Sequence, residues 1–306
     1  MLRYDDLQVF VHTSDSGSLS AAARQLEISP AVASAALKRL ESELEVRLFA
    51  RSTRSLRLTP EGDAFLLHAR ASLRSLEEGR RLLQGGKDQI AGVLQLSAPS
   101  DFGRNLLLPW LDEFQARYPQ LSLRLLLGDR GTYLYRQPVD VAIRYGAPAD
   151  SSLVALPLAP DNRRVLCAAP GYLAERGEPR QPDDLREHNC LLYQLGGRVH
   201  DRWAFQRGRR SLPLTVAGAR GCAAAAVVRR WALAGKGLVY KSWLDVAEDV
   251  RAGRLRLLLP EWQGEATPMN LLCTHRAQLT RPVTLLRAFV RERCDALLAE
   301  APWTRN

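Results

Sequence analysis

SLSAAARQLEISPAVASAALKRLESEL, residues 18–44, is the stretch that decides the fold of the first part of this chain. Ser18 and Ser29 each precede an Ala-rich run. Serine is favoured just before a helix because its hydroxyl accepts a hydrogen bond from a backbone N–H of the first turn. Pro30 suits the first helical position, where no backbone N–H is needed. The stretch therefore predicts two short helices joined by a tight connection, the second ending near Leu44.

The second of these helices is predicted to have two unlike faces. Its core face carries apolar residues spaced four, three and four apart, namely Ala33, Leu37, Leu40 and Leu44. The opposite face carries small side chains with one hydroxyl and one cation, namely Ala31, Ser34, Ala35 and Lys38. Nothing bulky holds this face away from the floor of a DNA major groove. We expect Ser34 and Lys38 to contact base edges or phosphates; a solvated surface lysine is the alternative for Lys38.

The start of the same helix is a further candidate DNA contact. Ser29, Pro30 and the N–H groups of the first turn suit a phosphate, because a helix N-terminus carries a partial positive charge. Two short apolar strands should follow, at Leu48–Phe49 and Leu56–Leu58. Their connection contains cationic and hydroxyl side chains that favour contact with phosphates or the minor groove, namely Arg51, Thr53 and Arg54. Ordinary loop cations are the alternative.

A long helix is expected next. Thr59 and Pro60 repeat the cap-and-proline start, and the pattern continues to about Gln84, before Gly85-Gly86. Within it, apolar residues follow the three-and-four spacing of a coiled-coil seam, namely Leu66, Ala69, Leu73, Leu76 and Leu83. A solitary helix of this length needs a partner, so we expect a homodimer or homotetramer.

From residue 91 onward, strands alternate with helices. Strands are expected at residues 93–96, 121–127, 139–144, 164–169, 238–240, 255–259 and 269–274, and helices at about 106–114, 223–233 and 283–298. This order is typical of an α/β sheet with crossover helices. Ligands bind such sheets at the carboxyl ends of strands. We therefore expect an effector near two strand ends, at Ser100, Asp101 and Phe102 and at Arg144 and Tyr145. A plain helix cap (Ser100) and a structural salt bridge (Arg144) are the alternatives.

The charge of the chain is unevenly distributed. The formal net charge is +10. Residues 1–90 contain 13 Lys and Arg against 12 Asp and Glu, whereas residues 91–306 contain 30 against 21. The excess therefore does not lie in the DNA-binding part, where only local placement supports DNA binding. The basic C-terminal part is a weak indication of an anionic ligand.

Cysteine and histidine usage narrows the class of protein. The five cysteines are scattered without a C-x-x-C pair, and the five histidines have no metal-ligand or triad spacing. No apolar run approaches 18 residues, which argues against a signal peptide or a membrane span. We expect a cytoplasmic protein with no cofactor, no metal and no membrane association.

The residues resemble the LysR-type transcriptional regulators over the whole chain. The most specific stretch is LQVFVHTSDSGSLSAAARQLEISPAVASAALKRLESELEVRLFARSTRSLRLTPEG, at residues 7–62. VDVAIRYG (139–146), LCAAPGYLAERGEPRQPDDLREHNCLLY (166–193) and GKGLVYKSWLDVAEDVRAGRLRLLLPEW (235–262) resemble stretches of the effector domain. The family usually has an arginine at the position of Ala35, so its DNA target preference is not carried over.

The resemblance implies a domain organisation. Residues 1–59 would be an all-α winged helix-turn-helix DNA-binding domain, residues 60–90 a dimerisation helix and hinge, and residues 91–306 an effector domain. The last would be a two-lobed α/β fold similar to type 2 periplasmic binding proteins, with lobe 1 at about 91–160 and 267–306 and lobe 2 at about 161–266. With the lobes so arranged, further residues face the cleft, namely Tyr193, Gly221, Cys222, Tyr240 and Lys241. Cys222, expected near a helix start, is also a candidate redox sensor, although an apolar packing role is the favoured interpretation.

The expected function is a DNA-binding transcriptional regulator controlled by a small, anionic or polar aromatic effector, with double-stranded promoter DNA as partner. An enzyme is disfavoured because the chain has no G-x-S-x-G, phosphate-binding glycine loop or H-E-x-x-H. A solute-binding protein shares the two-lobed fold but needs no DNA reader. A ligand-independent architectural DNA binder would not need two lobes.

Overall fold

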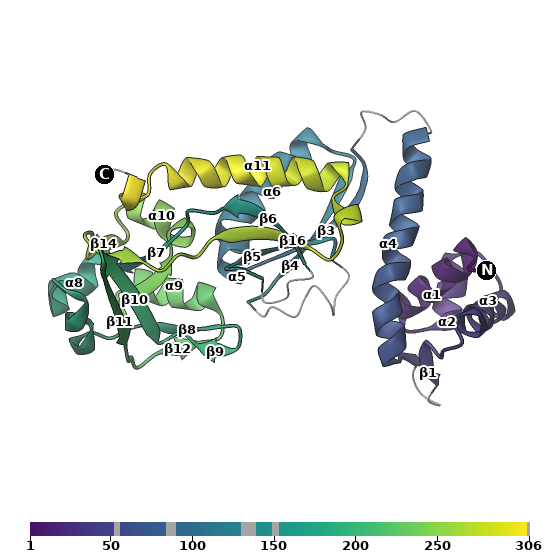
Figure 1. Cartoon of the computed structure of the whole chain (residues 1–306), viewed down its shortest axis with the longest axis horizontal. Coiled ribbons are helices and arrows are strands. Elements are labelled where there is room, and N and C mark those ends of the chain that lie inside the picture. The colour runs from purple at the N-terminus through teal and green to yellow at the C-terminus, as the bar shows by residue number, and fades with distance from the viewer. Residues whose placement is uncertain (52–55, 84–89, 130–138, 149–152, 305–306) are drawn as a thin grey trace. The chain divides into compact units, whose positions relative to one another are not determined.

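The computed structural model describes residues 1–51, 56–83, 90–129, 139–148 and 153–304. The chain folds as two compact units, Met1–Gln89 and Ile90–Asn306. Figure 1 labels their helices and strands.

The N-terminal unit is a set of four helices with a two-stranded hairpin. Its elements are α1 (Tyr4–Ser16), α2 (Leu19–Gln25), α3 (Pro30–Glu43), β1 (Phe49–Arg51), β2 (Leu56–Leu58) and α4 (Pro60–Leu83). The two expected caps form, because the Ser18 hydroxyl accepts from the Ala21 N–H and the Ser29 hydroxyl accepts from the Val32 N–H. Gly17 ends α1 in the left-handed region, with φ +65°, which glycine adopts at little cost.

The core of this unit is built around Phe10 of α1. Its ring meets the rings of Phe49 and Phe65, with centroids 5.6 Å away in each case. Leu37 and Leu40 of α3 are buried in the same cluster, as their helical spacing predicts. The opposite face of α3 is thereby turned toward solvent.

In the C-terminal unit, lobe 1 is a five-stranded sheet in the order β4-β3-β5-β16-β6. β3 runs parallel to β4 and β5, while β16 runs antiparallel to β5 and β6. The strands are β3 (Gly92–Ala98), β4 (Leu121–Leu127), β5 (Val141–Tyr145), β6 (Val154–Ala159) and β16 (Met269–Cys273). A continuous helical run follows β3, formed by α5 (Ser100–Phe102), the π-helix η1 (Gly103–Leu107) and α6 (Leu108–Arg117).

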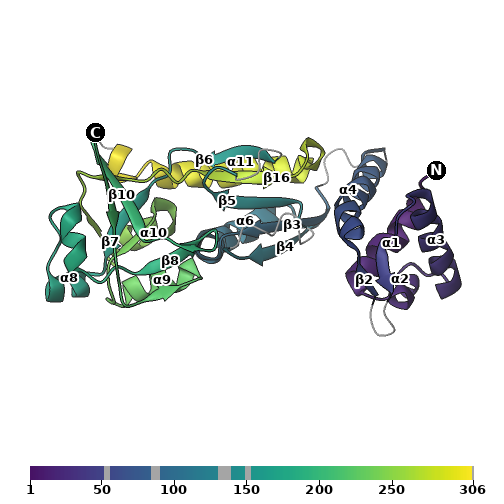
Figure 2. The same ribbon diagram turned by 60° about the horizontal axis from the view of Figure 1, so that its bottom comes forward.

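Lobe 2 contains three small sheets, ordered β13-β7-β14, β11-β10-β15 and β12-β8-β9. The strands are β7 (Arg164–Ala168), β8 (Leu192–Leu195), β9 (Arg198–Val199), β10 (Arg202–Arg207), β11 (Arg210–Thr215), β12 (Gly221–Cys222), β13 (Val239–Ser242), β14 (Arg256–Leu258) and β15 (Gln263–Gly264). The helices are α8 (Pro170–Arg176), the 3₁₀ turn η2 (Pro182–Glu187), α9 (Ala225–Leu233) and α10 (Trp243–Arg251). The 3₁₀ turns η3 (Arg276–Gln278) and η4 (Pro302–Thr304) flank α11 (Arg281–Leu298), which lies along lobe 1 in Figures 1 and 2.

The chain crosses between the lobes twice, at residues 160–163 and 265–268. The two crossings are bonded to each other. Asn162, which is fully buried, donates from Nδ2 to the Thr267 carbonyl at 2.7 Å and to Ser242 Oγ at 2.9 Å. The Thr267 N–H donates to the Asn162 carbonyl at 2.8 Å. The hinge is therefore one paired segment.

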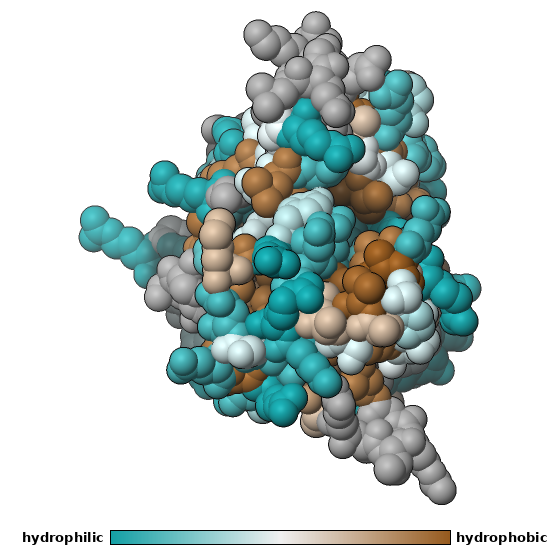
Figure 3. Space-filling view, turned by 90° about the vertical axis from the view of Figure 1, so that its right-hand side faces the viewer, coloured by the Kyte–Doolittle hydropathy of each residue, from teal (hydrophilic) through white to brown (hydrophobic). Residues whose placement is uncertain are grey.

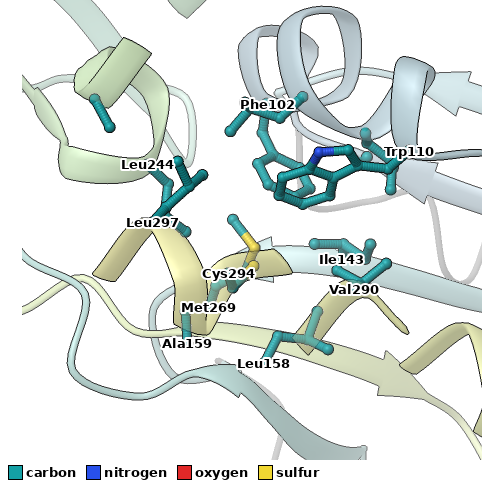
Figure 4. Packing of buried hydrophobic residues seen from close by; sticks show 14 of the residues in the cluster. Phe102, Trp110, Ile143, Leu158, Ala159, Leu244, Met269, Val290, Cys294 and Leu297 are labelled. Carbon is teal, nitrogen blue, oxygen red and sulfur yellow. The ribbon is translucent and has the colours of Figure 1, made fainter. Parts of the chain in front are cut away.

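One hydrophobic cluster extends across both lobes. Figure 4 shows Leu244 of α10, from lobe 2, near Phe102, Trp110 and Met269 of lobe 1. The Trp243 indole of α10 donates to the Leu297 carbonyl of α11 at 2.8 Å. The lobes thus meet in a dry, packed contact in this structure.

Two details differ from the expected elements. The Ala-rich helix begins at Ala225 rather than Ala223, and Gly221–Cys222 forms strand β12, paired with β8 in parallel. The hairpin β10/β11 and strand β6 have no counterpart among the expected elements. The hairpin consists largely of polar and charged residues, which hides its strand pattern.

Candidate functional site

The exposed face of α3 is the first candidate site. Ser29, Pro30, Ala31, Ala35 and Lys38 are exposed, and Ser34 is half-buried. Val32, which sequence reasoning did not single out, is 51% exposed on the first turn of the same helix. Figure 3 faces this unit and shows hydrophobic side chains exposed between hydrophilic ones. The face therefore offers a hydroxyl, a cation and apolar methyl groups to a partner.

Glu41 fixes the entry to the hairpin relative to α3. The carboxylate is 7% exposed and accepts from the Leu48 N–H at 2.9 Å and from the Phe49 N–H at 3.3 Å. Arg47 donates to its second oxygen at 3.0 Å. One acid thus satisfies two backbone donors that would otherwise be buried without partners.

The hairpin itself is only partly described. Arg51 ends β1 and pairs with Leu56 of β2. The side chain of Arg51, and all of Thr53 and Arg54, lie outside the described residues. Their contact with DNA stays a prediction.

The expected dimerisation seam divides into two parts. Leu66 and Ala69 are buried in the core of their own unit, with Leu73 packed against the same core. Leu76 is 58% exposed, and the side chain of Leu83 is outside the described residues. The first part of the seam is therefore used within the chain, because α4 covers α1 and the hairpin.

The second candidate site is a buried charged cluster between the lobes. The Lys241 ammonium, on β13 of lobe 2, pairs with Asp101 of lobe 1 and lies 3.3 Å from Asp245 of α10. The side chains of Lys241 and Asp101 are 1% and 2% exposed. Burial alone would lower the pKa of Lys241, but the two carboxylates outweigh it and hold that pKa above its ordinary value. Lys241 is therefore a charged contact between the lobes.

Two tyrosines extend this cluster. The Tyr145 hydroxyl, at the end of β5, donates to Asp245 Oδ1 at 2.7 Å. The ring of Tyr193 lies 5.3 Å from the Lys241 ammonium, and Arg164 donates to its hydroxyl. Burial, together with Asp245, raises the pKa of Tyr145, and burial raises the pKa of Tyr193. Both phenols stay protonated and act as hydrogen-bond donors.

Other expected effector residues lie apart from this cluster. Tyr240 is fully buried in a second hydrophobic cluster, where its hydroxyl donates to the Ala204 carbonyl at 2.7 Å. Neighbouring residues of a strand point to opposite faces, so Tyr240 and Lys241 have different surroundings. Phe102 is fully buried, with its ring against Trp110 and Tyr145 at 5.7 Å and 6.5 Å between centroids. It is a core residue of lobe 1.

Arg144, Gly221 and Cys222 are more accessible. Arg144 donates to Ser97 Oγ at 2.9 Å and to the Ile143 carbonyl at 2.6 Å. Gly221 is exposed and Cys222 is half-buried. All five cysteines carry free thiols.

Asp129 is a further cleft residue that sequence reasoning missed. It lies two residues after β4 and accepts from Ser100 of lobe 1 and from the Ala225 N–H of lobe 2. The strand-end rule that selected Ser100 also applies to β4, whose carboxyl end lies beside that of β3. Asp245 also had a signal, because it lies four residues after Lys241 at a helix start.

A hollow of about 580 Å³ lies elsewhere in the C-terminal unit. Its lining includes Leu257, Trp262 and Trp303 as well as Arg164. The expected effector residues lie outside this lining, so the hollow and the charged cluster are different features.

Within the described ranges, no group of three or more His, Cys, Asp and Glu side chains is placed to hold a metal ion. Among the helices of those ranges, none has the length and apolar character needed to cross a membrane.

Comparison with known proteins identifies both units. A family model described as "Bacterial regulatory helix-turn-helix protein, lysR family" matches residues 4–63, and one described as "LysR substrate binding domain" matches residues 87–295. The two together define a DNA-binding transcriptional regulator with an effector-binding domain. The chain belongs to the LysR family of transcriptional regulators. The family resemblance and the α/β fold class expected from the sequence are confirmed.

Individual relatives match over nearly the whole chain. The HTH-type transcriptional activator TtdR of Escherichia coli K12 is 32% identical, over 92% of this chain and 89% of its own length. CrgA, a LysR-type transcriptional regulator from Neisseria meningitidis, is 30% identical with a TM-score of 0.59, covering 96% of this chain and 99% of that one. A full-length variant of OxyR from Pseudomonas aeruginosa has a TM-score of 0.69 over 95% of each chain; at 18% identity this likeness shows the fold alone.

Proposed function

We propose that this chain binds promoter DNA through the exposed face of α3 and the hairpin, and that a small-molecule effector between the two lobes modulates this binding. In this proposal Ser34 and Lys38 contact bases or phosphates, and Ser29 with the first turn of α3 receives a phosphate. Arg51 and Arg54 provide the phosphate contacts of the hairpin.

The observation that carries effector control is the charged contact between the lobes. Lys241 of lobe 2 and Asp101 of lobe 1 are both buried and paired with each other. A ligand that changes how far the lobes close must alter this pair. A ligand shifts a conformational equilibrium only through different affinities for its states, and this pair gives the two states different energies.

The remaining parts of the proposal concern assembly, location and chemistry. The exposed part of the α4 seam, represented by Leu76, suits contact with a second copy in a homodimer or homotetramer. Five free thiols suit a reducing cytoplasm. The chain acts as a sensor rather than an enzyme, so it should release its effector unchanged. The basic excess of residues 91–306 favours an anionic effector.

DNA binding is tested by fluorescence anisotropy on DNA from immediately upstream of the chain's own gene, with excess nonspecific competitor. Lys38→Ala should weaken specific binding by about 1–3 kcal/mol if it contacts a base. Lys236→Ala is the matched control, because Lys236 is an exposed lysine of the C-terminal unit. Equal binding by Lys38→Ala and wild type would exclude Lys38 from the interface.

Effector control is tested by adding candidate organic acids to the same complex and measuring affinity and DNA bending. Bound compounds are then recovered and identified by mass spectrometry. A saturating ligand that changes neither affinity nor bending would refute the coupling, and a chemically altered ligand would indicate an enzyme.

A further inference from the structure

Asp129 is the starting observation, because its one carboxylate bonds both lobes. Oδ1 accepts from the Ser100 N–H at 2.8 Å, and Oδ2 accepts from Ser100 Oγ at 2.7 Å. Oδ2 also accepts from the Ala225 N–H at 3.1 Å. Ser100 begins the helical run of lobe 1, and Ala225 is the first residue of α9 in lobe 2. A single side chain on the β4 loop thus ties the two lobes together.

These three donors form a cradle suited to an acid. The residues before the two helices, Pro99 and Ala224, provide no side-chain cap, so the first N–H groups depend on Asp129. Ser100 is 8% exposed, and a hydrogen bond to a charged acceptor is stronger where water is scarce. Gly103 allows the helical run to lie close to β4, because a Cβ there would clash with Leu127.

The cradle is connected to the charged cluster through Ala225. Its N–H donates to Asp129, while its carbonyl accepts from the Lys241 ammonium at 3.3 Å. Lys241 in turn pairs with Asp101, the residue that follows Ser100. A change at Asp129 therefore acts on the same residues that join the lobes at Lys241.

We propose that Asp129 is an internal ligand of the inter-lobe cleft, and that a carboxylate effector binds by displacing it from Ser100 and Ala225. Without effector, Asp129 holds the lobes together. A free carboxylate replaces it one for one at the same three donors, and the displaced Asp129 moves to solvent. This inference rests on the proposed function for its regulatory meaning, but the occupancy of the cradle is tested without DNA.

The test measures hydrogen exchange of the full-length protein in peptides covering residues 100–107 and 225–233. In Asp129→Ala, exchange at the starts of α5 and α9 should rise roughly tenfold, as expected for loss of a hydrogen bond to a charged group. Sodium acetate should restore protection in this variant, whereas sodium chloride at equal ionic strength should not. In the wild type, acetate at the same concentration should have little effect, because the tethered carboxylate has a high effective concentration.

Two further variants keep the result interpretable. Asp112→Ala removes an exposed carboxylate from α6 and should leave exchange at both segments unchanged. Asp129→Asn keeps the size of the side chain but turns one acceptor into a donor, so it should raise exchange and respond less to acetate. It replaces Asp129→Ala if that variant fails to fold.

Unchanged exchange in both Asp129 variants would overturn the proposal, as would equal protection by acetate and chloride. The DNA assay separates this inference from the proposed function. Acetate rescue of the cradle with no change in DNA affinity would support Asp129 as the internal ligand and refute its coupling to DNA.

Discussion

The exposed face of α3 and the charged cluster between the lobes are opposite kinds of polar surface. On α3, Lys38 is exposed to water and Ser34 is half-buried. Between the lobes, Lys241 and Asp101 are almost fully buried and paired with each other. The first surface is ready to accept a partner as it stands. The second must break its own bonds before a ligand can use the same groups, which makes it suited to switching rather than to permanent attachment.

The largest effect expected on this comparison comes from Lys241→Met, which removes the ammonium and leaves Asp101 and Asp245 buried without a cation. The free energy of unfolding of the C-terminal unit should fall by about 3–5 kcal/mol. All six tryptophans lie beyond residue 90, so urea unfolding followed by tryptophan fluorescence reports on this unit.

Lys236→Met is the control for this variant, because Lys236 is exposed; it should change stability little. Adding Asp101→Asn to Lys241→Met should recover part of the loss, since one uncompensated carboxylate is removed. A loss below about 1 kcal/mol, the range of exposed pairs, would mean that the cluster is hydrated and that the contrast with α3 does not hold.

An intermediate effect is expected at Glu41, the buried acid behind the exposed face. Glu41→Ala leaves the Leu48 and Phe49 N–H groups without their acceptor and should destabilise the hairpin by about 1–3 kcal/mol. Glu41→Gln keeps the accepting oxygen and should have a smaller effect. Hydrogen exchange of residues 48–51 and 56–58 measures both. Equal effects of the two variants would show that the negative charge, rather than the acceptor, is what matters.

The smallest effect concerns pH. Burial alone would raise the pKa of Glu265, but hydrogen bonds and charge from His200, Ala204 and Arg164 lower it below its ordinary value of 4.5. A lowered pKa stabilises the fold above the unfolded value, and this stability is lost as the pH falls through the folded pKa. Glu265→Gln should therefore be less stable than wild type at neutral pH, with the gap narrowing below pH 4.5. A gap independent of pH would exclude this charge as the cause.

The two surfaces also differ in how far the sequence predicts them. The α3 face belongs to one helix, so the spacing of Ala33, Leu37 and Leu40 is enough to predict which side is exposed. Ser29 and Pro30 mark its start for the same local reason. Val32 was missed because an apolar residue on a helix is normally assigned to the core, whereas here it lies on the exposed side.

The inter-lobe cluster depends on contacts between residues far apart in the chain. Strand-end reasoning found Asp101 and Tyr145, and the family resemblance pointed to Tyr193 and Lys241. Neither indicated that these groups pair with one another, since Asp101 and Lys241 are 140 positions apart. Tyr240 was grouped with Lys241 because they are neighbours, but strand alternation separates them.

The paired hinge limits the ways in which the lobes can move. Two separate linkers would allow bending, twisting and shear between the lobes. Here the buried Asn162 side chain and the Thr267 backbone join the crossings edge to edge, which stiffens them against twisting and leaves bending as the softer motion. Lobe movement is thereby reduced toward a single mechanical degree of freedom. Ligands of different shape would then be reported to the DNA-binding unit on one common scale, as the angle of one joint.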